Sequence, residues 1–318
     1  MTPNKKDIIK IGLAQIAPIW LDKSKTQDKL ILYMEQAKNE GCDLVVFGEA
    51  ILPGYPFWVE LTDGARFNSS IQKDIWAHYF EAAINIQGGD LDLIQSTAKK
   101  LDIDVLFGSI ERAMDRGGHS LYCSLIYIDG FGVLKNVHRK LMPTYEERLV
   151  WSQGDGHGLQ VFPFEKFTLG ALNCWENWMP LARTALYAKG EDLHISIWPG
   201  NLRNTENLMR FIAEESRSYV VGVSGIFRKS DVNMDVPHAE LIFENCPDFC
   251  ANGGSCIAGP DGQWVIEPQV GSEGLYCAEI DHRQVRRERQ NFDPTGHYSR
   301  PDVLQLKINS ERQGTIIE

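Results

Sequence analysis

Three side chains that together could carry out nucleophilic catalysis each follow an apolar stretch of the sequence. Cys174 comes just after the apolar residues 167–172, and Glu49 and Lys140 follow other predicted strands. A thiol becomes a nucleophile when a base removes its proton, and the charge that develops on the attacked atom needs a cation or N–H donors. Glu49 can be the base, Lys140 the cation and the backbone N–H of Trp175 a further donor.

The surroundings of Cys174 predict a strand, a tight turn and a helix. Apolar residues recur at helical spacing over 179–189, and Gly190 is the expected C-cap. Such a turn exposes a side chain at the end of a sheet, and a helix N-terminus lowers the pKa of a nearby thiol. We therefore expect Cys174 to be an attacking thiolate that reacts with iodoacetamide before the other six cysteines.

Each of these residues also has a purely structural interpretation. Cys174 could be a small buried hydrophobic side chain, Glu49 a solvated loop carboxylate, and Lys140 a partner in a surface ion pair, since it follows His138 and Arg139. The catalytic interpretation depends on the three meeting in space, as side chains at the same ends of neighbouring strands do.

Aromatic residues gather near the same predicted strand ends. Single aromatic side chains usually belong to the core, but as a group they would wall an apolar pocket for a small, uncharged substrate. The predicted substrate-binding residues are Tyr55, Trp58, Tyr145, Trp175 and Trp198, with Trp178 nearby.

Composition narrows the class of protein. The 318 residues are 43% hydrophobic and 24% charged, as in an ordinary globular protein. A net charge of −11 without a basic cluster argues against a nucleic-acid partner. No apolar run is long enough to span a bilayer, and the N-terminus lacks signal-peptide anatomy. Seven scattered cysteines without a disulfide framework favour a reducing, cytoplasmic setting.

The elements that must position these residues alternate along the chain. Hairpins are mixed in, which favours an α/β protein with mixed sheets, and we expect one domain over residues 1–318, with a core over about 8–290 and a tail over 291–318. The expected strands are 8–16, 43–47, 103–109, 121–128, 133–137, 167–172, 193–198, 219–224, 254–257, 264–267 and 275–280. The expected helices are 23–40, 74–86, 91–101, 179–189, 205–218 and 281–290, and residues 231–252 are expected to form a surface loop.

Other kinds of site are weaker. His238, Cys246, Cys250 and Cys256 could bind zinc, but their spacing lacks the paired C-x2-C of common structural sites. No G-x-S-x-G supports a serine hydrolase, and no G-x-x-x-x-G-K supports a phosphate-binding loop.

The chain resembles the nitrilase superfamily of carbon–nitrogen hydrolases over almost its full length. The resemblance rests on three motifs in the family's order: Val46-Phe-Gly-Glu49, His138-Arg-Lys-Leu-Met-Pro-Thr144 and Asn173-Cys-Trp-Glu-Asn177. It implies that Glu49, Lys140 and Cys174 are a catalytic triad, and that Glu147 is a second active-site glutamate. Cys174-Trp-Glu-Asn177, the run from Arg148 to Gly156, and Gly296-His-Tyr-Ser-Arg-Pro-Asp302 resemble the nitrilase branch itself.

The resemblance implies a four-layer α-β-β-α sandwich of two mixed sheets, and hydrolysis of a small nitrile to the carboxylic acid and ammonia. No organic cofactor or metal is required, and a homo-oligomer, a dimer or larger, is expected. Gly48 replaces a proline common in the family and predicts a looser turn before Glu49, and the short tail after Asp302 argues against filaments. The alternatives are an amidase, a cyanide-processing relative and a non-catalytic binding protein on the same fold.

Overall fold

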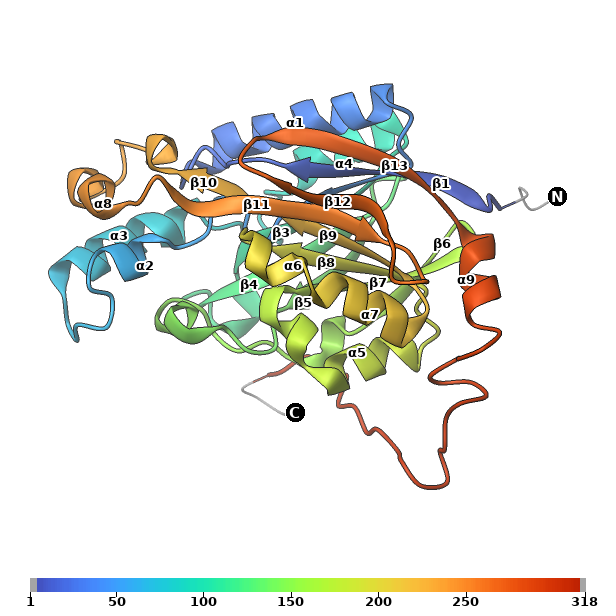
Figure 1. Cartoon of the computed structure of the whole chain (residues 1–318). Helices are drawn as coiled ribbons and strands as arrows, with labels where there is room; N and C mark the ends of the chain where they lie inside the picture. Colours follow the sequence, from blue (N-terminus) through green and yellow to red (C-terminus); the bar gives the residue numbers. More distant parts are fainter. Residues whose placement is uncertain (1–4, 315–318) are drawn as a thin grey trace.

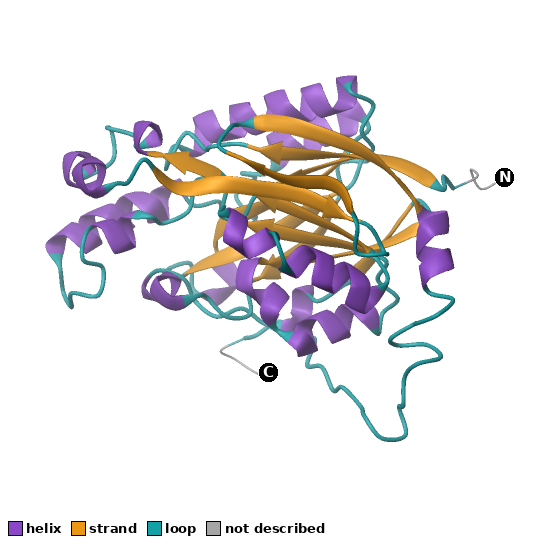
Figure 2. Cartoon of the chain, viewed as in Figure 1, coloured by secondary structure: helices purple, strands orange, loops and turns teal. Residues whose placement is uncertain are grey.

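The computed structural model describes residues 5–314 and contains two mixed β-sheets packed face to face between layers of helices (Figures 1 and 2). The predicted fold class is therefore confirmed. One sheet has six strands in the order β13-β1-β2-β3-β4-β5. The other has seven, in the order β10-β11-β9-β8-β7-β6, with β12 paired to β11.

The strands have the following bounds. The first sheet contains β1 (Ile8–Gln15), β2 (Leu44–Phe47), β3 (Asp104–Arg112), β4 (Leu121–Ile128), β5 (Leu134–Arg139) and β13 (Gly274–Asp281). The second contains β6 (Val161–Phe164), β7 (Phe167–Asn173), β8 (Leu193–Trp198), β9 (Tyr219–Ser224), β10 (Ile226–Arg228), β11 (Phe249–Ala258) and β12 (Trp264–Val270).

Helices cover the outer faces of the sheets and the ends of the strands (Figure 2). The α-helices are α1 (Lys23–Asn39), α2 (Trp58–Leu61), α3 (Ser70–Ala82), α4 (Asp92–Leu101), α5 (Pro180–Tyr187), α6 (Leu202–Thr205), α7 (Leu208–Ser216), α8 (Ala239–Asn245) and α9 (His282–Glu288). The 3-10 turns are η1 (Met114–Arg116), η2 (Tyr145–Leu149), η3 (Gly156–Gly158), η4 (Cys174–Trp178) and η5 (Lys229–Asp231).

Alternation along the strands produces the layers. In a strand, successive side chains point to opposite faces of the sheet. Leu44 and Val46 of β2 therefore face the second sheet, whereas Val45 and Phe47 pack under α1 and α4. On the other side, α7 packs beside Trp198 and α5 beside Leu172. Because both faces of the central strands β2, β7 and β8 are buried, these strands appear as apolar runs in the sequence.

Three predicted elements differ from the structure. The expected surface loop 231–252 contains α8 and the start of β11. Helix α8 has only seven residues, too few to show a clear period in the sequence. The helix expected over 205–218 is divided into α6 and α7, and the Thr205 hydroxyl donates a hydrogen bond to the Gly254 carbonyl at the division. Helix α3 begins earlier than expected because Ser69 caps it.

The strand ends that carry the candidate residues meet between the two sheets. In the first sheet β1, β2 and β3 are parallel, and in the second β7, β8 and β9 are parallel. The C-terminal end of β2 therefore lies at the same edge as those of β1 and β3, and the C-terminal end of β7 at the same edge as those of β8 and β9. Glu49 comes just after β2, and Cys174 directly after β7. Within residues 5–314, no helix combines the length and apolar character needed to cross a membrane.

Candidate active site

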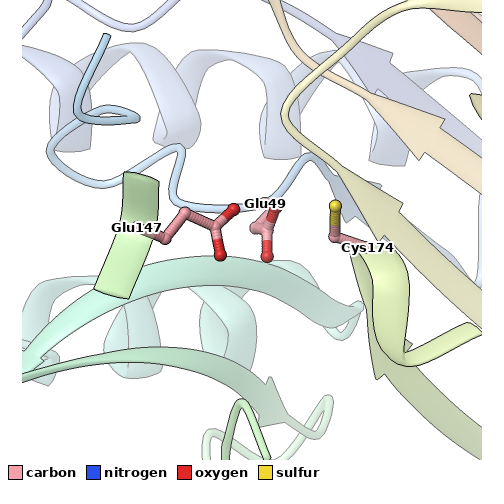
Figure 3. Close-up of side chains that lie close together, drawn as sticks. All are labelled: Glu49, Glu147 and Cys174. Atoms are coloured by element: carbon pink, nitrogen blue, oxygen red, sulfur yellow. The ribbon is translucent and has the colours of Figure 1, made fainter. Parts of the chain in front are cut away.

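The structure brings Glu49, Glu147 and Cys174 together (Figure 3), and Lys140 contacts both glutamates. The Lys140 Nζ lies 2.8 Å from Oε1 of Glu49 and 2.7 Å from Oε2 of Glu147. One side-chain oxygen of each glutamate and the Cys174 sulfur lie within 4.8 Å of one another. All four side chains are buried, so Glu49 is not a solvated loop carboxylate and Lys140 is not in a surface ion pair.

The turn before Glu49 is fixed by its neighbours. The backbone N–H of Glu49 donates to the Trp198 carbonyl at 3.0 Å, and Gly108 N–H donates to the Gly48 carbonyl at 3.0 Å. A Cβ at position 48 would lie 2.7 Å from the backbone nitrogen of Gly225. The expectation of a loose turn at Gly48 was therefore wrong. Glycine allows the backbones of the two sheets to approach, and their hydrogen bonds hold the turn.

Cys174 occupies a strained backbone position at the end of β7. Its φ of 43° lies in the left-handed region, which costs a non-glycine residue of order 1–3 kcal/mol. The turn is held by a capping box, in which Glu176 accepts from the Asn173 N–H at 2.8 Å. The Asn177 side chain donates to the Cys174 carbonyl at 2.8 Å. These contacts hold the turn that places the sulfur within 4.8 Å of a Glu49 carboxylate oxygen.

Lys140 and Glu147 are positioned by a short loop. Lys140 directly follows β5, and its N–H donates to the Cys123 carbonyl at 2.8 Å. Thr144 and Glu147 form a capping box at the start of η2, in which the Thr144 N–H donates to Oε2 of Glu147 at 2.6 Å. The Tyr55 hydroxyl donates to the other oxygen of Glu147 at 2.8 Å. Glu147 therefore has partners on both oxygens.

The electrostatics favour a charged Lys140 and a basic Glu49. Burial alone would lower the pKa of Lys140, but the carboxylates of Glu147 and Glu49 outweigh it and raise that pKa well above its usual value. Burial raises the pKa of Glu49 to about 7, against the opposing effect of Lys140. Oε2 of Glu49 is buried without a hydrogen-bond partner, so this oxygen is free to accept a proton.

The expected low pKa of Cys174 was wrong. Burial and the nearby Glu49 carboxylate raise the pKa of the thiol well above its ordinary value, although Lys140 and a hydrogen bond from the Trp175 N–H lower it. A five-residue 3-10 turn follows the cysteine, so no long helix points its N-terminus at the sulfur. Cys174 therefore rests as a thiol that needs a base at the moment of attack.

Sequence reasoning missed Glu176, which joins the two halves of the site. Its buried carboxylate contacts His138 Nε2 at 3.0 and 3.1 Å, and it accepts from the Leu141 N–H at 2.6 Å as well as from Asn173. It therefore connects the loop after Lys140 to the turn that carries the thiol. The Asn-x-x-Glu spacing of a capping box was a visible signal for it.

Two further contacts near the reacting groups were also missed. His194 lies 2.8 Å from the side-chain oxygen of Asn177 and 2.9 Å from Glu191, so a buried chain of three polar side chains supports the Cys174 carbonyl. On the other side, the Cys123 sulfur lies 3.5 Å from Oε1 of Glu49. No pattern in the sequence singled out Cys123.

A cavity of about 880 Å³ opens onto Cys174 and Glu147. Tyr55, Tyr145 and Trp175, all predicted substrate-binding residues, line it. Trp58 and Trp198, from the same prediction, do not: both are fully buried in the core clusters behind the cavity. Trp58 and Trp198 therefore pack in the core and do not contact the cavity.

The alternative zinc site is not assembled. His238 is bound to Asp74 at 2.9 Å, and Cys256 is fully buried in β11. Only Cys246 and Cys250 meet, with their sulfurs 3.5 Å apart. Among the described residues, the only group with metal-ligand spacing is Glu49, Glu147 and Cys174, and there the Lys140 ammonium contacts both carboxylates.

Comparison with known sequences finds close relatives over most of the chain. A family profile described as carbon–nitrogen hydrolase matches residues 10–290. Nitrilase 2 of Arabidopsis thaliana is 34% identical over 308 residues, which cover 95% of this chain and 89% of that protein. A bifunctional nitrilase/nitrile hydratase of Lupinus angustifolius is also 34% identical, with 94% of this chain and 86% of that protein covered.

Solved structures share the fold at lower sequence identity. A carbon–nitrogen hydrolase from Helicobacter pylori has a TM-score of 0.69 and 20% identity, covering 93% of this chain and 96% of that one. An amidase from Nesterenkonia sp. has a TM-score of 0.63 and 15% identity, covering 89% and 94%. These likenesses support the four-layer architecture.

Proposed function

Because the chain belongs to the carbon–nitrogen hydrolase family and is a hydrolase of carbon–nitrogen bonds, we propose that its reaction is that of a nitrilase. It would convert an organic nitrile to the carboxylic acid and ammonia. One observation carries the proposal: the Cys174 sulfur lies within 4.8 Å of a carboxylate oxygen of Glu49, and Glu49 contacts the Lys140 ammonium at 2.8 Å, in a chain with curated nitrilase relatives. The same arrangement opposes a non-catalytic binding protein.

In the proposed first step, Cys174 attacks the nitrile carbon. The Glu49 carboxylate takes the thiol proton as the sulfur–carbon bond forms and then passes it to the nitrile nitrogen, which gives a thioimidate and restores the carboxylate. Negative charge develops on that nitrogen, and the Lys140 ammonium and the Trp175 N–H stabilise it. Because Lys140 and its carboxylate partners are buried, the ammonium acts more strongly than it would in water.

In the following steps, two waters release the products. Glu49 activates the first water, which adds to the thioimidate carbon, and ammonia leaves to give a thioester on Cys174. A second water, activated in the same way, cleaves the thioester to the acid and restores the thiol. Glu147 holds Lys140 at 2.7 Å throughout, and Tyr55 holds Glu147.

The preference for a nitrile over an amide follows from the shape and donors of the site. A linear nitrile offers one acceptor nitrogen, which suits the donors Lys140 and Trp175 and the aromatic wall of Tyr55, Tyr145 and Trp175. An amide brings an NH2 group that needs acceptors, and a site lacking them discriminates strongly. Glu49 and Glu147 could accept from such a group, so we expect some amide release or slow hydrolysis.

The test is kcat/KM for matched substrates. We expect phenylacetonitrile and an aliphatic nitrile each to be hydrolysed faster than the corresponding amide, with ammonia and released amide measured together. If both amides react faster than their nitriles, the protein is an amidase. If no substrate is turned over by well-folded protein, the non-catalytic alternative replaces both.

The proposed enzyme is a homo-oligomer, a dimer or larger. Support comes from a patch of half-exposed apolar side chains on neighbouring helices, made by Trp178, Leu181 of α5 and Phe211 of α7. Arg183 and Glu215 join these two helices at 2.8 Å beneath it. Light scattering at micromolar concentration tests this: a strict monomer would contradict it.

A further inference from the structure

A second pair of cysteines lies far from Cys174 in the fold, on the helix-covered side of the first sheet. Cys42 lies between α1 and β2, Cys277 lies on β13, and their sulfurs are 3.5 Å apart. Strand β1 runs between β2 and β13, and its Gly12 is paired with Cys277. A Cβ at Gly12 would lie 3.2 Å from the Cys42 sulfur, so the missing side chain leaves room for the two thiols to meet.

The two thiols differ in access and charge. Cys42 is buried, whereas Cys277 is partly exposed in a small surface depression with Gln36, Asn39 and Glu40. The Cys42 thiol donates a hydrogen bond to the Cys277 sulfur, and this bond, helped by the Lys10 ammonium, lowers the pKa of Cys277 to about 7 against the opposing effects of burial and Glu40. The exposed member of the pair is therefore a thiolate near neutral pH.

We propose that Cys277 and Cys42 form a thiol–disulfide exchange site for small organic disulfides, with Cys277 as the attacking thiol and Cys42 as the resolving thiol. This assignment rests on the sulfur–sulfur distance of 3.5 Å, the solvent accessibility of Cys277 and the burial of Cys42. It is independent of the nitrilase proposal, because no residue of the pair contacts the Cys174 site.

The exchange proceeds in two balanced steps. The Cys277 thiolate attacks one sulfur of the disulfide RSSR, which forms a Cys277–SR bond, and the other half leaves as RS⁻ and takes a proton from water. Cys42 then loses its proton and attacks the Cys277 sulfur, and the second RS⁻ leaves. The two cysteines give two electrons to RSSR, so the products are a Cys42–Cys277 disulfide and two RSH.

The chain contains a matched control pair. Cys246 and Cys250 are also 3.5 Å apart. Burial raises the pKa of Cys246, and burial together with the neighbouring Cys246 raises that of Cys250, so neither is a thiolate at neutral pH. Because exchange depends on the fraction of thiolate, we expect Cys42 and Cys277 to be oxidised at least ~10-fold faster than this control pair.

The experiment exposes the full-length protein to bis(2-hydroxyethyl) disulfide near neutral pH and follows it by intact mass and peptide mapping. The wild type should lose two hydrogens as the Cys42–Cys277 disulfide forms. Cys42→Ser should stop at a mixed disulfide on Cys277, and Cys277→Ser should leave Cys42 unmodified. Circular dichroism checks that both variants are folded.

Three results would overturn the assignment. One is a wild-type protein in which Cys277 stays free while other cysteines react. Another is a mixed disulfide on wild-type Cys277 that Cys42 never displaces. The third is oxidation of Cys246 and Cys250 before the proposed pair.

Discussion

The two thiols at Cys174 and Cys277 show opposite ways of placing a sulfur beside a lysine and a carboxylate. Cys174 is only 3% exposed, and burial and Glu49 raise its pKa well above the ordinary value. Cys277 is partly exposed. A hydrogen bond from the Cys42 thiol, together with the nearby Lys10 ammonium, lowers the pKa of Cys277 to about 7. Each sulfur has a cation within reach, so the cation alone does not decide the charge state.

The difference implies that the thiol proposed as the nucleophile need not be the most reactive thiol of its protein. At Cys174, Lys140 is already paired with two carboxylates, and the buried group carries a net negative charge that opposes a thiolate. Attack there requires the base Glu49 and a bound substrate. At Cys277 the lowered pKa favours the thiolate without a bound substrate, and the residue is partly exposed at the surface. Five predictions test this contrast, beginning with the largest expected effect.

Substitution of the two cysteines should separate the two regions completely. Cys174→Ala should remain folded and lose all measurable nitrile turnover, because the covalent intermediate cannot form. Cys277→Ala should keep wild-type kcat and KM, because this residue lies away from the cavity. Ammonia release measures both. Turnover by the Cys174 variant would remove Cys174 from the mechanism.

The two partners of Cys174 should each contribute strongly to the rate. Glu49→Gln and Lys140→Met keep side-chain bulk, and each should lower kcat at least ~100-fold through loss of proton transfer or charge stabilisation. Lys140→Met also leaves two buried carboxylates without a cation, and breaking a buried pair destabilises by ~3–5 kcal/mol.

The control is Lys135→Met on β5, the strand that Lys140 follows, where the Lys135 ammonium lies 3.9 Å from Asp129 at the surface. This variant should keep near-wild-type activity. Unfolding curves separate lost stability from lost chemistry. A loss well short of ~100-fold in a folded Glu49 or Lys140 variant would exclude that residue from the chemical steps.

The order of alkylation should be the reverse of that expected from the sequence. In the absence of substrate, iodoacetamide should modify Cys277 at least ~10-fold faster than Cys174, because alkylation follows thiolate fraction and access. Peptide mapping after short exposure measures both rates, with Cys246 and Cys250 as slow references. If Cys174 is labelled first in the free enzyme, its thiolate exists at rest and the contrast fails.

The pH dependence should report Glu49. Its pKa is raised to about 7 by burial, and only the carboxylate can accept the thiol proton. As pH falls through about 7 the carboxylate is lost, so kcat/KM should fall ~10-fold for each further pH unit. The rate of Cys277 alkylation should fall over the same pH range. Glu49→Gln should abolish the pH dependence of kcat/KM but leave that of Cys277 alkylation unchanged. An acid limb near pH 4–5 would indicate that Glu49 is not perturbed.

The smallest effect is expected at Cys123, which lies 3.5 Å from Oε1 of Glu49. The Cys123 thiol and the Lys140 ammonium share that oxygen, and Oε2 of Glu49 has no hydrogen-bond partner. Cys123→Ala should move the acid limb of kcat/KM upward, because the Cys123 hydrogen bond lowers the pKa of Glu49. The rate loss should be ~10-fold or less. An unchanged pH profile would show that Cys123 only fills space.

The pattern of apolar runs was sufficient to predict mixed sheets and the meeting of Glu49, Lys140 and Cys174, whereas the four-layer arrangement was implied by the family resemblance. Both faces of β2, β7 and β8 are buried, so these strands appear as apolar runs, and the candidate side chains follow the runs directly. Ends of parallel strands share an edge whatever their separation in sequence. The chemical roles of the three residues stay predictions.

What the sequence could not predict depends on side-chain direction and local charge. Trp58 and Trp198 lie near the right strand ends but point into the core, and no pattern distinguishes them from Trp175. The Glu176–His138 contact joins motifs 38 residues apart. The pKa of Cys174 depends on burial and on Glu49, which a helix N-terminus argument leaves out.

The most direct test of the central claim is to trap the covalent intermediate. Enzyme mixed with phenylacetonitrile and quenched in acid during turnover should carry one substrate-derived group, and peptide mapping should place it on Cys174, with Cys277 unmodified. Glu49→Gln should accumulate far less of it. An adduct on another residue, or sustained turnover by wild-type enzyme in which Cys174 has been alkylated, would contradict the account.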